Sequence, residues 1–144
     1  MKSNLVLLEK MTEVQRRERE RLKKEYDDVV HLGGEYFAVK HGQQWGCVAD
    51  GHLICDVQYD KISYFEEGFA IVRLGRKFGF INRAGVPICL PEYDLVYFFT
   101  DGYAVVAKSR MFGAINEEGK VICPLRYASS REVDQVIREQ SLVM

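Results

Sequence analysis

The sequence predicts a mainly β fold: an array of three β-hairpin repeats of about 34 residues, flanked by an N-terminal charged helix and a short C-terminal helix. Three observations predict it. The same kinds of residue recur in register in three consecutive rows. Within each row, short runs of aromatic and β-branched residues alternate with turn residues, which is typical of hairpins. The segments before and after the rows contain no glycine or proline and have helical patterns.

The repeat divides the central domain, residues 26–127, into three units: residues 26–58, 59–92 and 93–126. Each unit begins with Tyr-Asp, and the starts lie 33 and 34 residues apart. The matched positions are Tyr-Asp (Tyr26-Asp27, Tyr59-Asp60, Tyr93-Asp94), a ring (His31, Tyr64, Phe98), an acid (Glu35, Glu67, Asp101), an aromatic-alanine pair (Phe37-Ala38, Phe69-Ala70, Tyr103-Ala104), an aromatic-glycine pair (Trp45-Gly46, Phe78-Gly79, Phe112-Gly113), a turn glycine (Gly51, Gly85, Gly119) and Ile-Cys (Ile54-Cys55, Ile88-Cys89, Ile122-Cys123). Agreement at so many positions establishes an internal repeat.

Each unit is predicted to be a three-stranded meander. In the second unit, Phe69–Arg73 and Phe78–Asn82 are strand-like and are separated by a turn at 74–77. A second turn contains Asn or Asp together with glycine, which supply the positive φ angles of a tight reversal. The third strand contains Ile-Cys, and Pro91 and Pro124 are expected to end it. A unit of this size cannot bury its own apolar face, so the units must stack, in an open or a closed array.

The two ends are expected to be helical. In residues 1–25, the segment Glu9–Glu25 has seven basic and five acidic side chains, which predicts a highly charged helix. In residues 128–144, Ser129 and Glu132 have the spacing of a capping box, which predicts a C-terminal capping helix. Such helices could cover the exposed ends of a repeat stack.

Composition limits the class of protein. The chain has 144 residues, 47% apolar residues and a formal net charge of −1, from 20 basic and 21 acidic side chains. These values predict a globular domain and exclude a disordered or polybasic chain. No run approaches the roughly 18 apolar residues of a membrane span, and the N-terminal segment does not have the pattern of a signal peptide. We therefore expect a cytoplasmic protein with reduced cysteines that does not enter a membrane.

The rows resemble the WG repeat of bacterial proteins, also called the KWG repeat, over about residues 26–127. The second unit matches best, through Gly-Arg-Lys-Phe-Gly-Phe-Ile-Asn at residues 75–82. The chain departs from the family pattern where Phe78 and Phe112 replace the tryptophan of the motif, and the first unit lacks the closing proline. The resemblance implies a β-hairpin repeat used for binding or scaffolding, without catalytic residues, and of bacterial or phage origin.

Metal binding is the first chemical alternative. The three histidines, His31, His41 and His52, all lie in the first unit near Cys47 and Cys55, and imidazole with thiolate suits zinc. However, His52 and Cys55 are an odd number of residues apart, so they would point to opposite faces of a strand. The repeated cysteines are better explained as small buried apolar side chains. We expect no metal site.

Catalysis is the second alternative. The chain has no nucleophile and base pattern with a known local signature, and Gly33-Gly34 lacks the lysine of a phosphate-binding loop. The acids at Glu35, Glu67 and Asp101 recur in every unit, whereas a catalytic group is needed once. The sequence therefore predicts a protein that is not an enzyme and needs no cofactor.

The predicted function is a non-catalytic module for protein–protein interaction or scaffolding that presents a repeated β surface. Aromatic and basic side chains often dominate such contacts. The candidate partner-binding residues are Trp45, Tyr64, Phe78, Phe112, Arg76, Lys77 and Arg110. The partner would be a protein, with self-association also open because three units are few for a stack.

Two alternatives for binding remain open. In the first, the array is a scaffold and the N-terminal helix docks the protein into a larger assembly. In the second, aromatic and basic strand positions bind single-stranded nucleic acid. The net charge of −1 argues against nucleic acid, because the chain lacks a large positive field.

Overall fold

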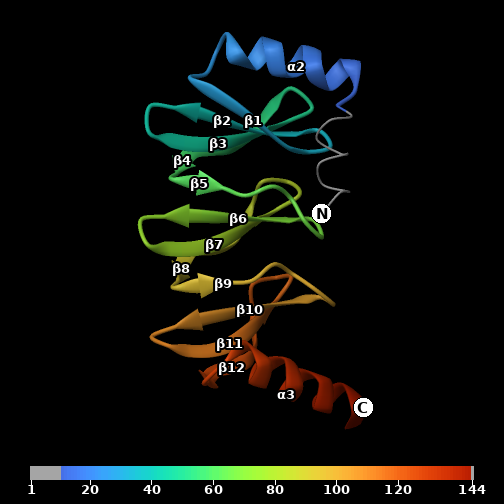
Figure 1. The fold of residues 1–144 in the computed structure, drawn as a ribbon, viewed down its shortest axis with the longest axis vertical. Helices are drawn as coiled ribbons and strands as arrows, with labels where there is room; N and C mark the ends of the chain where they lie inside the picture. Colours follow the sequence, from blue (N-terminus) through green and yellow to red (C-terminus); the bar gives the residue numbers. More distant parts are fainter. Residues whose placement is uncertain (1–10, 144) are drawn as a thin grey trace.

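The computed structural model describes residues 11–143, and the chain forms a column of three sheets with a helix at each end (Figure 1). Helix α2 (Glu13–Lys23) lies over one end and α3 (Ser130–Val143) over the other. The start of the predicted N-terminal helix, Glu9 and Lys10, lies outside the described residues.

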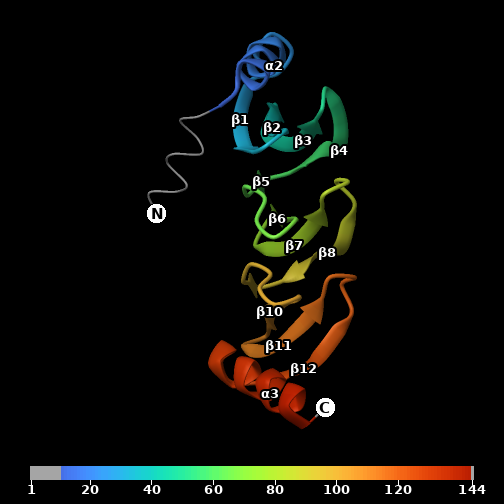
Figure 2. The same cartoon turned by 90° about the vertical axis from the view of Figure 1, so that its right-hand side faces the viewer.

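Three four-stranded antiparallel sheets follow one another along the chain, and each is built in sequence order. The first sheet contains β1 (Asp28–Gly33), β2 (Tyr36–His41), β3 (Gln44–Ala49) and β4 (His52–Tyr59); the second contains β5 (Lys61–Ile62), β6 (Phe69–Leu74), β7 (Lys77–Asn82) and β8 (Pro87–Tyr93); the third contains β9 (Leu95–Val96), β10 (Tyr103–Lys108), β11 (Met111–Asn116) and β12 (Val121–Tyr127). The predicted mainly β array with two flanking helices is confirmed. The array is an open stack (Figure 2).

Each sheet has one strand more than the predicted meander. The additional strand follows the Tyr-Asp pair and adds to the outside of the central hairpin, as in the pairing of Lys61 with Arg73. In the second and third sheets it is only two residues long. A strand this short has no alternating pattern, and its pairing depends on a hairpin later in the chain.

The aspartate of each Tyr-Asp pair closes the first hairpin turn of its own unit. The carboxylate accepts a hydrogen bond from the backbone N–H of a turn residue: Gly42 to Asp27 at 2.7 Å, Gly75 to Asp60 at 2.7 Å and Ser109 to Asp94 at 2.8 Å. These turn residues have φ angles of 66°, 63° and 53°. The bond fixes the two-residue turn, which explains why the pair recurs at the start of every unit.

The glycine of each aromatic-glycine pair faces a bulge in the last strand of its sheet, which is β4, β8 or β12. A Cβ on Gly46, Gly79 or Gly113 would lie 2.6, 2.8 or 2.5 Å from the carbonyl oxygen of the opposing cysteine residue. The register shifts at the same place in all three sheets. Glycine is required here because the bulged backbone passes too close for a side chain.

Two details of the sequence prediction are wrong at this point. Pro91 and Pro124 do not end their strands but lie within β8 and β12, in the bulges. Proline is tolerated there because a bulge leaves an N–H outside the ladder. In the first unit, the structure aligns Tyr36 rather than Phe37 with Phe69, because Tyr36 begins β2 as Phe69 begins β6.

The core lies between the layers rather than inside any one sheet. One apolar cluster joins the first and second sheets through residues such as Cys55, Tyr59 and Val72, and a second joins the second and third sheets through Phe80 and Phe99. Because both faces of every sheet are covered, strand residues of opposite orientation are buried alike. This explains why β2, β6 and β10 lack a clear alternation of apolar and polar residues.

Consecutive units touch through the same contacts. Tyr36 stacks on Phe65 of the next unit with ring centroids 4.0 Å apart, and Phe69 stacks on Phe99 at 4.2 Å. The turn glycines Gly85 and Gly119 also lie against backbone carbonyls of the last strand in the preceding sheet, β4 and β8. The two interfaces between units are therefore built alike.

The helices take the place of missing neighbours. Leu22 of α2 is 1% exposed and packs with Met11, Phe37 and Val48 on the outer face of the first sheet. At the other end, Val133 of α3 is buried against the third sheet.

Local hydrogen bonds fix both helix starts. Thr12 and Gln15 form a capping box at the start of α2. Their spacing of three residues is the sequence pattern of such a box, and the sequence prediction of this helix did not include it. At the predicted box of α3, the Glu132 N–H donates to Ser129 at 3.3 Å. The hydroxyl of Tyr103 donates to Asp134 of α3 at 2.8 Å, which joins the helix to the third sheet.

Candidate binding surfaces

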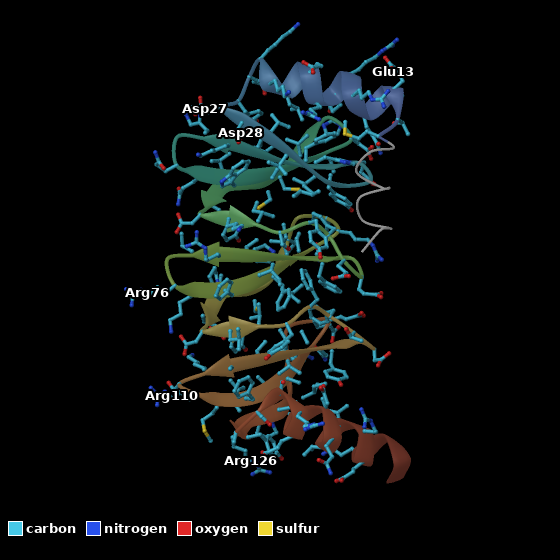
Figure 3. The ribbon with its side chains drawn as sticks, viewed as in Figure 1. Glu13, Asp27, Asp28, Arg76, Arg110 and Arg126 are labelled. Carbon is cyan, nitrogen blue, oxygen red and sulfur yellow. The ribbon has the colours of Figure 1, made fainter. Side chains whose placement is uncertain are left out.

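The tips of the three central hairpins lie on one side of the stack, which we call the hairpin edge. Its members are the turn and adjoining residues 40–45, 73–78 and 107–112. Arg76 and Arg110 project from the tips of neighbouring hairpins (Figure 3). Both are exposed, and neither forms an ion pair with another described residue.

One ion pair links two units across the hairpin edge. The ammonium group of Lys77 contacts the carboxylate of Asp94, which also accepts the N–H of Ser109. These two bonds, the one from Lys77 first, lower the pKa of Asp94. Lys77 is therefore partly engaged within the stack and less available to a partner than Arg76.

The three predicted anchor rings lie at equivalent places beside the hairpin tips. Trp45, Phe78 and Phe112 are each half-buried, and each lies opposite a tyrosine in the last strand of its sheet. The ammonium group of Lys40 lies 5.8 Å from the centroid of the Trp45 ring. The rings thus share their surface between the stack and solvent, and the charged tips are the more accessible part of the edge.

Tyr64 does not join this group. It lies in the loop between β5 and β6, whereas Phe78 lies beside the turn at the far end of the β6–β7 hairpin. Six strand residues, about 20 Å, separate the two ends. Tyr64 is 45% exposed and stacks on Phe98 of the next unit at 5.5 Å. The structure therefore places the candidate residues on two separate surfaces.

The histidines and cysteines do not converge. Among the described residues, no group of three or more His, Cys, Asp or Glu side chains is arranged to hold a metal ion. Cys47 and Cys55 face each other across β3 and β4, and burial raises the pKa of their thiols to about 12 and about 11. Thiols with such pKa values are poor nucleophiles at neutral pH.

The repeated acids belong to turns. Glu67 and Asp101 have positive φ angles of 54° and 55° in the loops that enter β6 and β10. In the first unit, Gly34 has the equivalent left-handed conformation, with φ of 52°, and Glu35 follows it. The recurrence of these acids therefore coincides with a recurring turn.

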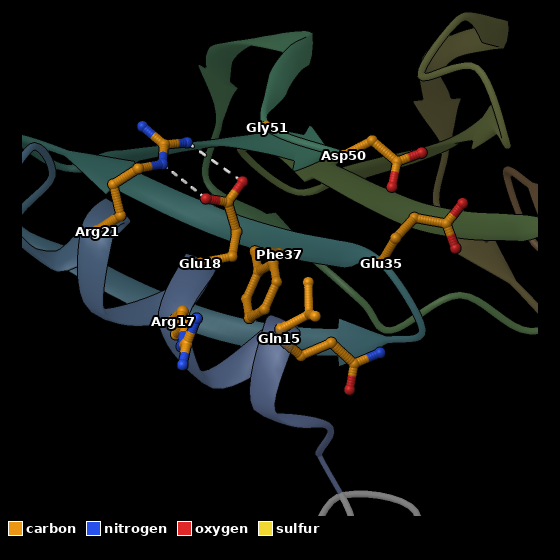
Figure 4. A pocket seen from close by; sticks show the side chains of 9 residues that line it. Gln15, Arg17, Glu18, Arg21, Glu35, Phe37, Asp50 and Gly51 are labelled. Carbon is orange, nitrogen blue, oxygen red and sulfur yellow. Dashed lines mark hydrogen bonds and ion pairs between the residues drawn. The ribbon is translucent and has the colours of Figure 1, made fainter.

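A groove of about 460 Å³ lies at the α2 end of the stack (Figure 4). Its walls come from one face of α2 and from the turn between β3 and β4. Glu18 projects toward Gly51 and is bound to Arg21 at 2.6 Å. The sequence gives no local signal of this groove, because the groove forms only when the helix packs on the first sheet.

Part of the array matches a known repeat family. The model of the WG containing repeat matches residues 49–78 and 78–109, two adjacent stretches. Residues 49–109 match two WG repeats. The predicted resemblance is thereby confirmed. The same comparisons found no match among curated proteins and none among solved structures.

The structure gives the WG pair a physical meaning in this chain. The glycine of the pair leaves space for the bulged backbone of the last strand of its sheet. The ring beside the glycine lies opposite a tyrosine. Phenylalanine fills the ring position in two units, where Phe78 and Phe112 lie opposite a tyrosine as Trp45 does. The WG repeats of this chain therefore depend more strictly on the glycine than on the tryptophan.

The described helices contain none with the length and apolar composition that crossing a membrane requires.

Proposed function

We propose that this WG-repeat chain is a non-catalytic binding or scaffold module that contacts a protein partner through its hairpin edge. The observation that supports the proposal most directly is the alignment of three equivalent hairpin tips on one side of the stack. A partner that follows the stack axis would meet similar geometry at each unit. Repetition of this kind suits binding, because several weak contacts add along one surface.

The charge of the edge indicates how the contact would form. In the second and third units, Arg76 and Arg110 at the tips are joined by Arg73 and Lys108 beside them. The carboxylates in this region, Asp60 and Asp94, are already hydrogen bonded to turn N–H groups. Guanidinium groups without an intramolecular ion pair favour a partner with exposed carboxylates, and such contacts mainly affect orientation and association rate.

An affinity capture from extract of the source cells tests the proposal, with mass spectrometry as the readout. The full chain is compared with the double variant Arg76→Glu and Arg110→Glu. We expect one enriched protein with the full chain and at least tenfold less of it with the variant. The matched control is Lys120→Glu with Arg131→Glu, which changes the net charge equally at exposed positions away from the hairpin edge. Equal capture by all three proteins would refute a contact at the hairpin edge.

Docking through α2 is a second candidate. The helix turns Arg16, Arg17, Glu20 and Lys24 to solvent, and the apolar Val14 is 75% exposed. The variant Val14→Asp with Arg17→Glu leaves the buried Leu22 contact in place. A partner lost with this variant but retained by the hairpin-edge variant would support docking through α2.

A further inference from the structure

The turn glycine before the last strand of each sheet lies against a strand of the preceding unit in the second and third units, but not in the first. In the second and third units, the turn glycine lies against the last strand of the preceding sheet, β4 or β8. A Cβ on Gly85 would overlap the carbonyl oxygen of Ile54, and one on Gly119 would overlap that of Ile88. The contact therefore brings an extended backbone with an aliphatic residue directly against a glycine.

Gly51 is the matching turn glycine of the first unit, in a turn that is one residue shorter, and its φ is 78° against 78° for Gly85 and 83° for Gly119. Within residues 11–143, no strand lies against it. The atom nearest to a Cβ built there is a carboxylate oxygen of Glu18, at 3.4 Å. Gly51 is exposed, whereas Gly85 is buried. The first unit thus presents the accepting half of the contact without its strand.

The groove described above opens at this glycine (Figure 4). Val14 of α2 contributes an exposed apolar side chain, and Phe37 lies at the base. Glu35 and Asp50 stand along one wall, and neither forms an ion pair with another described residue. Arg17 and Arg21 also line the groove, but they pair with Glu13 and Glu18. The charged lining groups without an ion pair to another described residue are therefore the two carboxylates.

We propose that this groove binds an extended peptide segment of a partner protein. An aliphatic residue of the segment places its backbone carbonyl against Gly51, as Ile54 does against Gly85. A lysine or arginine two residues further along the segment pairs with Glu35 or Asp50, because those carboxylates complement a cation. This site is independent of the hairpin edge, which lies at the opposite end of the central hairpins.

A second copy of the chain fits the groove less well than a peptide. The matching strand residue at the other end of the stack, Ile122, is 43% exposed. However, α2 and α3 cover the two ends of the column (Figure 1). A layer can approach Gly51 at the normal sheet spacing of about 10 Å only if no helix lies between. A single extended segment has no such obstacle.

The test measures fluorescence polarisation of a labelled peptide with the full-length protein. The peptide has the sequence of residues 52–58 with Cys55→Ser and Asp56→Lys, so that it provides the aliphatic strand and a lysine. We expect saturable binding that weakens at least tenfold with Gly51→Asn, whose side chain would fill the space beside the turn. Asparagine tolerates the positive φ angle.

The matched control is Gly42→Asn, because Gly42 has φ of 66° and nothing within 4 Å of a Cβ. This variant, and the double variant at Arg76 and Arg110, should bind the peptide with unchanged affinity. If Gly51→Asn fails to fold, Glu35→Lys at an exposed position provides the test, and the same tenfold loss is expected.

Four results would overturn the proposal. The first is absence of saturable binding, and the second is equal affinity for the Gly51→Asn and Gly42→Asn variants. The third is binding that appears only after residues 1–10 are removed, which would assign the groove to the chain's own N-terminal segment. Self-association at the concentrations used, detected by analytical ultracentrifugation, would instead assign the groove to a second copy. None of these results depends on whether the hairpin edge binds its own partner.

Discussion

Glycine meets two different physical requirements within each unit. At Gly75 the requirement is a positive φ angle, and a Cβ there would meet nothing within 4 Å. At Gly79 the φ angle is not positive, but a Cβ would lie 2.8 Å from the carbonyl oxygen of Cys89 and 2.9 Å from the backbone of Leu90. The first position tolerates asparagine, whereas the second tolerates no side chain.

The variant Gly79→Ala is therefore expected to destabilise the protein strongly. The new methyl group must displace the bulged backbone of β8, which costs about 1–3 kcal/mol as an overpacked core does. Gly75→Asn is the control and should change the free energy of unfolding by no more than about 0.5 kcal/mol. Urea denaturation followed by circular dichroism measures both. A Gly79→Ala protein as stable as the control would contradict the role assigned to the glycine.

Asp94 makes stability depend on pH in a defined direction. Lys77 and the Ser109 N–H lower its pKa in the folded protein. Its stabilising effect is complete above the ordinary aspartate pKa of about 3.9 and is lost as pH falls through the lower folded-state value. Asp94→Asn should therefore lower Tm at pH 7, and the difference from wild type should shrink as pH falls below about 3.9.

Differential scanning fluorimetry across this pH range measures the effect. Glu92→Gln is the matched control, because Glu92 is a neighbouring exposed carboxylate, whereas the hydrogen bond from the hairpin turn goes to Asp94. A difference between wild type and Asp94→Asn that did not shrink as pH fell below about 3.9 would show that the side chain stabilises the turn by packing rather than by charge.

At the scale of the element, each helix is stabilised mainly by the sheet beneath it. Leu22 is 1% exposed and belongs to the cluster under α2, whereas Val14 on the same helix is 75% exposed. Leu22→Ala should cost about 2–5 kcal/mol, since it removes buried methyl groups. Val14→Ala should change stability by about 0.5 kcal/mol or less. Thermal unfolding of both variants, monitored by circular dichroism, provides the comparison.

The elements that sequence could predict are those fixed by local residues. Hairpins and turns follow from glycine, asparagine and β-branched residues close together in the chain, and both flanking helices follow from their own patterns. The additional strand at Lys61 and the bulges at Pro91 and Pro124 depend on pairing with distant residues, so local patterns did not indicate them.

The same distinction applies to the candidate sites. The shared position of Phe78 and Phe112 followed from the repeat, because equivalent residues occupy equivalent places in stacked units. The separation of Tyr64 from them did not, because sequence register does not say which end of a hairpin faces which surface. The groove at Gly51 required the packing of α2, which no residue pattern encodes locally.

At the scale of the whole molecule, α3 protects the apolar face of the third sheet. Val133 is fully buried against Val105, Ala114 and Cys123. Replacing it with aspartate would place a charge in this contact, which is unfavourable without a partner. We expect Val133→Asp to remove amide protection from α3 in hydrogen exchange and to cause concentration-dependent association, because the uncovered face can pair with another copy.

Analytical ultracentrifugation over a hundredfold range of concentration measures the association. Gln135→Asp is the control, since Gln135 is an exposed residue on the same helix. A monomeric Val133→Asp protein with a fully protected α3 would show that the helix is not held by this contact.

The second unit presents both halves of the contact between units. Its Gly85 receives Ile54 from the unit before it, and its Ile88 is received by Gly119 of the unit after it. A duplicate of residues 59–92 placed directly after Glu92 would therefore meet a familiar neighbour on each side. The length of this column is set by how many interchangeable modules the gene encodes, and it can grow by tandem duplication without any new interface having to evolve.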